Sequence, residues 1–217
     1  MSKKINSVLG TNLKSSIFNY VKNAESVNLE IDFGFKTNSD KVFDLNIPKH
    51  KYDKMLDYLL KKNNFKYKKD LVYYIYSYRN LRLFMDEKTP GKFLKCLKTQ
   101  FIDGHNIYNS DGFFDLKITT MKKTPVSIHS FCSLEHYDNL IKRSTTSLNY
   151  NNQFYINFSK VITEKGITHH IKILLAKNIS SHKSKIFVNL YEQIKNMSHI
   201  LDLKLDSLNF NVSEPLL

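Results

Sequence analysis

The sequence VNLEIDFGF at Val27–Phe35 decides the fold of this chain. Hydrophobic residues alternate with polar or small ones along it, and a period of two is typical of a β-strand with one apolar face. Glu30 and Asp32 share the other face, about 7 Å apart along the strand. Two interpretations stay open: a solvated face of an antiparallel sheet, or a site that uses carboxylate oxygens for a hard metal ion or for phosphate chemistry.

The composition predicts an anionic partner. The 217 residues include 33 Lys and Arg against 20 Asp and Glu, a formal net charge of +13. Such an excess predicts attraction to nucleic acid, polyphosphate or an acidic protein. The alternative is that part of the charge is compositional, because Lys, Asn, Ile and Tyr are abundant together, as AT-rich coding sequence produces.

Several classes of protein lack support in the sequence. We find no apolar run long enough to span a membrane and no signal-peptide core at the N-terminus, so we expect no membrane association. Cys96 and Cys132 are not in a metal-ligand spacing. They predict reduced thiols in a cytoplasmic location. Walker A, G-x-G-x-x-G, G-x-S-x-G and C-x-x-C motifs do not occur.

Segments with period two recur along the chain and predict an antiparallel sheet. They are 42–47, 71–78, 80–85, 92–98, 113–120, 141–148, 153–161 and 168–176. Turns are expected at 86–91 and 163–166, and a loop at 103–112. Pro125 interrupts the segment that comes after 113–120.

Amphipathic helices are expected at 13–23, from Pro48 to Asn64 and from Phe187 to Leu201. Many strands of similar length between helices predict one α+β domain over 1–217, a closed or nearly closed antiparallel β-barrel with flanking helices. Residues 1–12 are expected to form a polar lead-in, and 202–217 a C-terminal tail.

The order of these segments resembles the metal-dependent RNA 5′-triphosphatases of fungal and large-DNA-virus mRNA capping systems, which belong to the triphosphate tunnel metalloenzymes. The motifs that carry the resemblance are LEIDFG on the first strand, then NLRL, KFLKCLKT and FDLKI. They fall in the family's order over roughly residues 13–201. The resemblance implies an eight-stranded tunnel in which inward carboxylates hold Mn²⁺ or Mg²⁺ and inward basic residues bind the triphosphate.

The resemblance also assigns roles to residues of this chain. Glu30 and Asp32 would hold the metal and serve catalysis. The phosphate-binding residues would be Arg82, Lys117, and Lys142 or Arg143. Metal and guanidinium groups stabilise the charge that develops when a positioned water attacks the terminal phosphorus. For each basic residue the alternative is an exposed surface charge.

The last two strands depart from the family pattern. The sequence at Tyr155–Ser159 is YINFS where the family typically has R-I-D-L-T, so Asn157 replaces an acidic residue. His170, Lys172 and Leu174 stand where the family has E-x-E-x-E. The carboxylates that remain on the first strand would bind a hard divalent cation weakly.

The alternation in 168–176 predicts which of these side chains face the interior. The aliphatic residues Ile171, Ile173 and Leu175 need the apolar side, so His170 and Lys172 are expected to face Glu30 and Asp32. The residues expected to line the cavity are Tyr155, Asn157, Ser159, His170 and Lys172. We expect Lys172 to neutralise Glu30 or Asp32 directly, in place of a cation.

Three functions remain open at this point. The first is an RNA 5′-triphosphatase-like domain of an mRNA capping system, with Mg²⁺ or Mn²⁺ as cofactor if it is active. The second is a non-catalytic basic tunnel, needing no cofactor, that binds RNA 5′ ends, polyphosphate or a capping-enzyme partner. The third is a structural subunit with compositional charge, which predicts no RNA binding at physiological salt.

Overall fold

The computed structural model describes residues 15, 27–36, 43–89, 91–107, 115–128, 137–175 and 183–200. Its strands are β1 (Val27–Lys36), β2 (Phe43–Asp44), β3 (Phe65–Tyr78), β4 (Leu81–Asp86), β5 (Phe93–Ile107), β6 (Asp115–Pro125), β7 (Asn139–Tyr150), β8 (Phe154–Thr163) and β9 (Gly166–Leu175). The helices are α2 (Lys49–Leu60) and α3 (Lys183–Ile200). Neither has the length and apolar character needed to cross a bilayer, and the finding concerns the described residues only.

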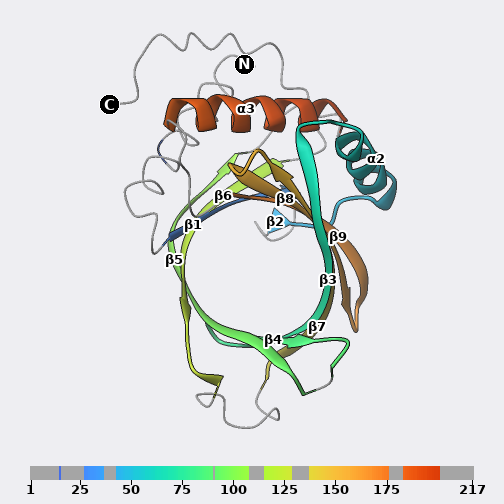
Figure 1. Cartoon of the computed structure of the whole chain (residues 1–217). Coiled ribbons are helices and arrows are strands. Elements are labelled where there is room, and N and C mark those ends of the chain that lie inside the picture. The colour runs from blue at the N-terminus through green and yellow to red at the C-terminus, as the bar shows by residue number, and fades with distance from the viewer. Residues whose placement is uncertain are drawn as a thin grey trace.

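The strands form a closed antiparallel barrel (Figure 1). The order is β2-β1-β6-β5-β4-β3-β7-β8-β9, and β1 also pairs with β9, which closes the ring. Among the described strands, the short β2 pairs only with the end of β1, where Phe35 lies opposite Asp44. Eight of the nine strands therefore make the wall: the closed barrel confirms the prediction from the sequence, and eight is the number that the resemblance implies.

The hydrophobic core lies outside the barrel wall, under the helices. Leu29, Ile31 and Phe33 of β1 are fully buried on the outer face. Aliphatic and aromatic residues of β6, β8 and β9 join them in one cluster with residues of α2 and α3. Figure 1 shows α3 lying across one side of the barrel and α2 beside it. Because the helices supply the apolar partner, the inner face of the barrel is free to be polar.

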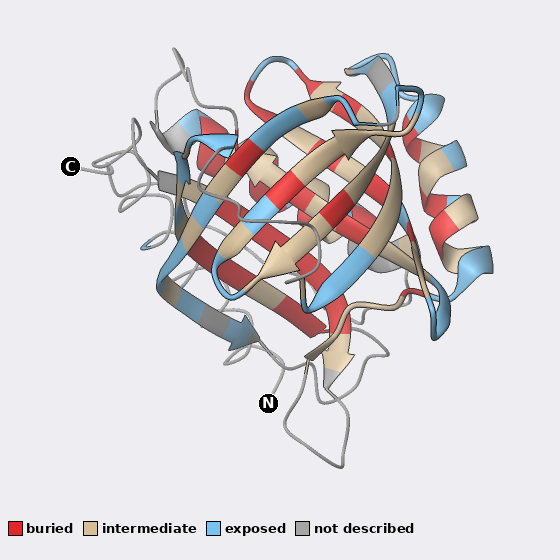
Figure 2. Cartoon of the chain, turned by 90° about the horizontal axis from the view of Figure 1, so that it is seen from below, coloured by how far each residue is buried: buried red, intermediate tan, exposed pale blue. Residues whose placement is uncertain are grey.

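Each helix presents one apolar stripe to the barrel. In α2, which begins after Pro48, Tyr52, Met55 and Leu59 are buried. In α3 the buried residues include Ile186, Leu190, Ile194 and Met197, again at helical spacing. Figure 2 shows this burial on the side of α2 that faces the strands, with exposed residues on the other side.

Gly34 allows β2 to pack closely against β1. A Cβ atom at this position would lie 2.0 Å from the carbonyl oxygen of Asp44 and 2.5 Å from the ring of Phe43. The glycine in the LEIDFG motif is therefore required by close backbone approach.

Several predicted boundaries differ from the structure. The segment 103–112 was expected to be a loop, but β5 continues to Ile107, so this prediction is wrong for residues 103–107. A bulge after Phe101 and the close approach of its ring to Gly104 explain why glycine-containing sequence still pairs with β6. Strand β6 runs to Pro125, which ends it. The helix predicted at 13–23 lies outside the described residues apart from Ser15, and the lead-in 1–12 and the tail 202–217 lie wholly outside them.

Candidate functional site

Strand register places the predicted site residues of β1, β6 and β9 on the inner face of the barrel. Asp32 lies opposite Lys117 of β6 and opposite Lys172 of β9. Glu30 lies opposite Thr119 and Leu174. Residues in direct register share a face, so these side chains meet inside the barrel.

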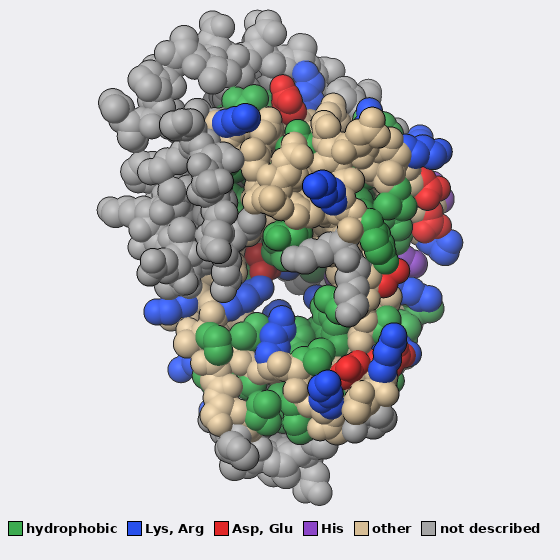
Figure 3. Space-filling model, viewed as in Figure 1, with side chains coloured by type: hydrophobic (Ala, Val, Ile, Leu, Met, Phe, Trp, Pro, Cys, Tyr) green, Lys and Arg blue, Asp and Glu red, His purple; other side chains and the backbone are tan. Residues whose placement is uncertain are grey.

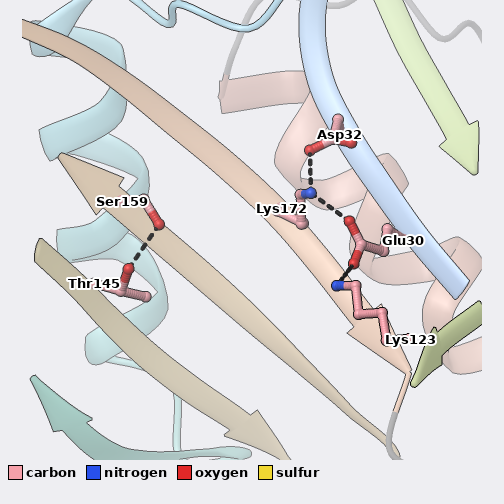
Figure 4. A network of polar contacts seen from close by, with 6 residues as sticks. All are labelled: Glu30, Asp32, Lys123, Thr145, Ser159 and Lys172. Carbon is pink, nitrogen blue, oxygen red and sulfur yellow. Dashed lines mark hydrogen bonds and ion pairs between the residues drawn. The ribbon is translucent and has the colours of Figure 1, made fainter. Parts of the chain in front are cut away.

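Four of the inner side chains form a lysine–carboxylate cluster: Glu30, Asp32, Lys123 and Lys172 (Figure 4). The Nζ of Lys172 donates a hydrogen bond to Oε2 of Glu30 and lies 3.2 Å from Oδ1 of Asp32. The Nζ of Lys123, from β6, donates to the other oxygen of Glu30. The sequence predicts that Lys172 neutralises one of the two carboxylates, and in the structure its ammonium pairs with both.

Burial and charge act in opposite directions on these carboxylates. Glu30 is 2% exposed, which disfavours its charged form, but Lys172 and Lys123 outweigh burial and lower its pKa from 4.5 to about 2. At Asp32 burial dominates, and repulsion from Glu30 adds to it, so its pKa is raised despite Lys172. Burial alone would lower the pKa of Lys172, yet Asp32 and Glu30 raise it above its ordinary value. Lys172 is therefore a permanent cation at neutral pH.

The residues present do not fit the divalent metal that the predicted site would hold. Both carboxylates already lie against ammonium groups, and a hard cation needs several oxygen ligands. Among the described residues no group of three or more His, Cys, Asp and Glu side chains could hold a metal ion. The interior positions of β8 and β9 carry Asn157, His170 and Lys172 instead of further carboxylates.

Basic residues extend the inner face beyond this cluster. The register places Arg82 opposite Leu97, Lys95 opposite Phe84, and Arg143 opposite Val161. Together with Lys117 these residues form the basic inner set: Arg82, Lys95, Lys117 and Arg143. Asp86 and Asp115 share the inner face, and they balance the charge of this set only in part.

Lys142 does not belong to this set. It pairs with Tyr74 and Ile162 on the outer face of the barrel, where it forms an ion pair with Glu87 and lies over the ring of Tyr74. Of the two adjacent basic residues that the sequence left as alternatives, the structure places Arg143 inside and Lys142 outside, because neighbours on a strand point to opposite faces.

Neutral polar side chains line the interior beside the cluster. Ser159 and Thr145 share a hydrogen bond of 2.9 Å, and Ser147 donates to Asn157 at 2.7 Å. Tyr155 continues the same face of β8. The Nε2 of His170 lies 3.0 Å from Oγ1 of Thr168. The predicted lining residues therefore lie on one wall, formed by β8 and β9.

Sequence reasoning missed two inner basic residues. Lys95 lies within the KFLKCLKT motif, but a bulge between Phe84 and Met85 shifts the register there, so alternation alone does not fix its face. Lys123 follows Lys117 at an even spacing on one strand, which would have placed both inside. The predicted strand ended at Thr120, whereas β6 continues to Pro125, so Lys123 was not assigned to it.

A space-filling view shows that the barrel is hollow. In Figure 3 an opening passes through the middle of the molecule, with Lys and Arg side chains around it and acidic atoms at one edge. The interior is therefore a tunnel lined by both charged and hydrophobic groups.

Comparison with solved structures identifies the fold. The S. pombe Pct1 RNA triphosphatase aligns with a TM-score of 0.69 at 13% identity, over 91% of this chain and 92% of that chain. Its complex with the Spt5 CTD gives 0.67 at the same identity. The Mimivirus capping enzyme triphosphatase aligns with a TM-score of 0.55 at 10% identity, over 86% of this chain and 94% of that chain. No protein-family model matches the sequence, and no curated protein matches it.

Proposed function

We propose that this chain binds the 5′-triphosphate end of RNA inside its basic tunnel without hydrolysing it. The observation that carries the proposal is the position of Lys172, whose ammonium bridges Glu30 and Asp32. An internal cation of this kind neutralises the carboxylates that a metal-dependent triphosphatase would need. The fold shared with RNA triphosphatases, at low identity, supports the tunnel as the place where the anion binds.

The charges of the tunnel support anion binding. Lys123 and Lys172 balance Glu30 and Asp32, so the cluster contributes little net charge. The basic inner set remains to attract phosphates, and guanidinium groups such as that of Arg143 bind phosphate oxygens in a planar, paired geometry. Because the chain itself would not complete the reaction, we propose a catalytic capping subunit as its partner.

The test combines a binding assay with a hydrolysis assay on the same protein. Fluorescence anisotropy compares a 5′-triphosphate RNA with the 5′-hydroxyl RNA of identical sequence, in EDTA and then in excess Mn²⁺ or Mg²⁺. We expect tighter binding of the triphosphate RNA, equal affinity with and without chelator, and a steep loss of affinity as salt rises. Arg143→Gln should weaken binding, whereas Lys160→Gln, an exposed residue on the outer face of β8, should not.

Phosphate release distinguishes the catalytic alternative. We expect no release above buffer from the triphosphate RNA with either metal ion. Release that depends on metal and disappears in Glu30→Ala would contradict the proposal and establish a working triphosphatase. Equal, negligible affinity for both RNAs at physiological salt would instead favour a structural subunit whose charge is compositional.

A further inference from the structure

We propose that His170 couples anion binding in the tunnel to proton uptake, so that a bound phosphate chain converts His170 into an additional cationic contact beside Arg143. The inference rests on the proposed function, because it concerns the same tunnel and the same ligand. It adds a regulatory property: affinity should increase as the pH falls.

The register brings Arg143 and His170 to one wall of the tunnel. Thr145 and Arg143 lie on the inner face of β7, where Thr145 is opposite Ser159 of β8. His170 of β9 is in turn opposite Ser159. His170 therefore lies on the second strand from Arg143, displaced along the wall by one inward-facing residue. Repulsion from the Arg143 guanidinium contributes to the lowered pKa of His170.

Arg143 carries a donor that has no acceptor among the described residues. Its Nε is buried and makes no hydrogen bond to any of them. A buried charged donor without a partner is costly, and an oxygen of a bound anion would satisfy it. An anion that accepts this hydrogen bond from Arg143 would lie against the inner wall formed by β7, β8 and β9, where Ser159 and His170 also face the tunnel.

The free tunnel keeps His170 neutral. Burial, then repulsion from Arg143, Lys172 and His169, lowers its pKa to about 4. Its Nε2 remains within 3.0 Å of Thr168 Oγ1.

The charged inner residues of β6 nearest this wall, Asp115 and Lys117, lie opposite Gly34 and Asp32 of β1 and carry opposite charges. The inner residues of β8 beside His170, Ser159 and Asn157, do not titrate. The inner acidic residues of β1, Glu30 and Asp32, are engaged with Lys172. Among the charged residues, Arg143, Lys172 and His169 act on His170, and their positive field lowers its pKa.

An anion bound between these groups would reverse that field. Negative charge beside His170 favours the imidazolium, so the pKa in the complex rises above that of the free protein. The complex then holds more protons than the free protein between the two pKa values. By linkage, affinity for the anion increases as pH falls through the pKa of His170 in the complex, and it levels off near the pKa of His170 in the free protein, about 4.

The experiment measures affinity for inorganic tripolyphosphate in EDTA by calorimetry, for the wild type and His170→Gln. The probe itself titrates in this range, so the quantity of interest is the ratio of the two affinities at each pH. We expect the ratio of wild-type to variant affinity to rise about tenfold between about pH 7.5 and about pH 5, if the pKa in the complex reaches about 6. His50→Gln, at an exposed position on α2 outside the barrel, should follow the wild type.

NMR of the wild type gives a readout that does not depend on a variant folding. The assigned ring resonance of His170 should titrate near pH 4 without probe and at least about two units higher with saturating tripolyphosphate. Binding with an unmoved resonance, or with a constant affinity ratio, overturns this inference and leaves the proposed function standing. No binding by the wild type at any pH overturns the proposed function and this inference with it.

Discussion

Lys172→Met is the most informative perturbation of the lysine–carboxylate cluster. The substitution removes the ammonium that bridges Glu30 and Asp32 but keeps the volume of the side chain. Glu30 retains its hydrogen bond from Lys123. Asp32 loses its ion pair with Lys172 while staying buried at 6% exposure, so it becomes the source of the destabilisation.

The structure sets the size of this effect. Asp32 can avoid an unpaired buried charge by binding a proton. At pH 7 this costs about 4 kcal/mol, because an unperturbed Asp titrates about three pH units lower. We therefore expect a loss of about 4 kcal/mol of unfolding free energy at pH 7, within the range for breaking a buried ion pair.

The loss should shrink in acid. In the variant the folded-state pKa of Asp32 lies above its unfolded value, so the folded protein binds more protons than the unfolded chain between the two. Stability relative to the wild type is therefore regained as pH falls, and the deficit should be about 1 to 2 kcal/mol at pH 5.

Urea denaturation at both pH values measures these quantities. Lys160→Met, which removes an exposed lysine from the outer face of β8, is the matched control and should change stability by less than about 0.5 kcal/mol. Adding Asp32→Asn to Lys172→Met should restore part of the stability at pH 7, because the amide needs no counter-charge. A Lys172→Met protein as stable as the control at pH 7 would refute a buried, bridging ammonium.

Other positions in the barrel can be tested in the same way. Glu30→Gln should remove a pH dependence of stability. The pKa of Glu30 is about 2 in the folded protein against 4.5 unfolded, which stabilises the wild type by about 3 kcal/mol above pH 5 and by less as pH falls toward 2. The unfolding free energies of the two proteins, measured by denaturation at decreasing pH, should therefore converge in acid. Lys172→Glu should bind Mn²⁺ measurably by calorimetry where the wild type does not, and equal, negligible heats in both would count against a shared cavity. Gly34→Ala should lower the melting temperature, because its Cβ would lie 2.0 Å from the Asp44 carbonyl oxygen. In Gly91→Ala the new Cβ would meet nothing within 4 Å, so any loss there reports only the strain of the positive φ of +83° at this turn position.

The fold was predictable because alternation decides which face of each strand is apolar. Ile171, Ile173 and Leu175 require the outer face of β9, and that requirement alone places Lys172 on the inner face, opposite Asp32. The same logic places Glu30 and Asp32 inside. The boundaries of β5 were not predictable, because the bulge after Phe101 lets Gly104 continue a strand that its composition argues against.

The site was predictable only in part. The departures from the metalloenzyme pattern at Asn157, His170 and Lys172 are visible in the sequence, and they predict the absence of carboxylates there. The sequence does not show that Lys123 supplies a second ammonium to Glu30, because that contact joins residues far apart in the chain. It also left Lys142 and Arg143 as alternatives, and only the register of β7 against β3 and β8 separates them.

The most direct test of the central claim is a crystal of the protein soaked in Mn²⁺ and measured by anomalous scattering. We predict electron density for the Lys172 side chain with its ammonium group between Glu30 and Asp32, and no anomalous peak within bonding distance of either carboxylate. An anomalous peak coordinated by Glu30 and Asp32, with Lys172 turned away, would contradict the bridging role of this lysine.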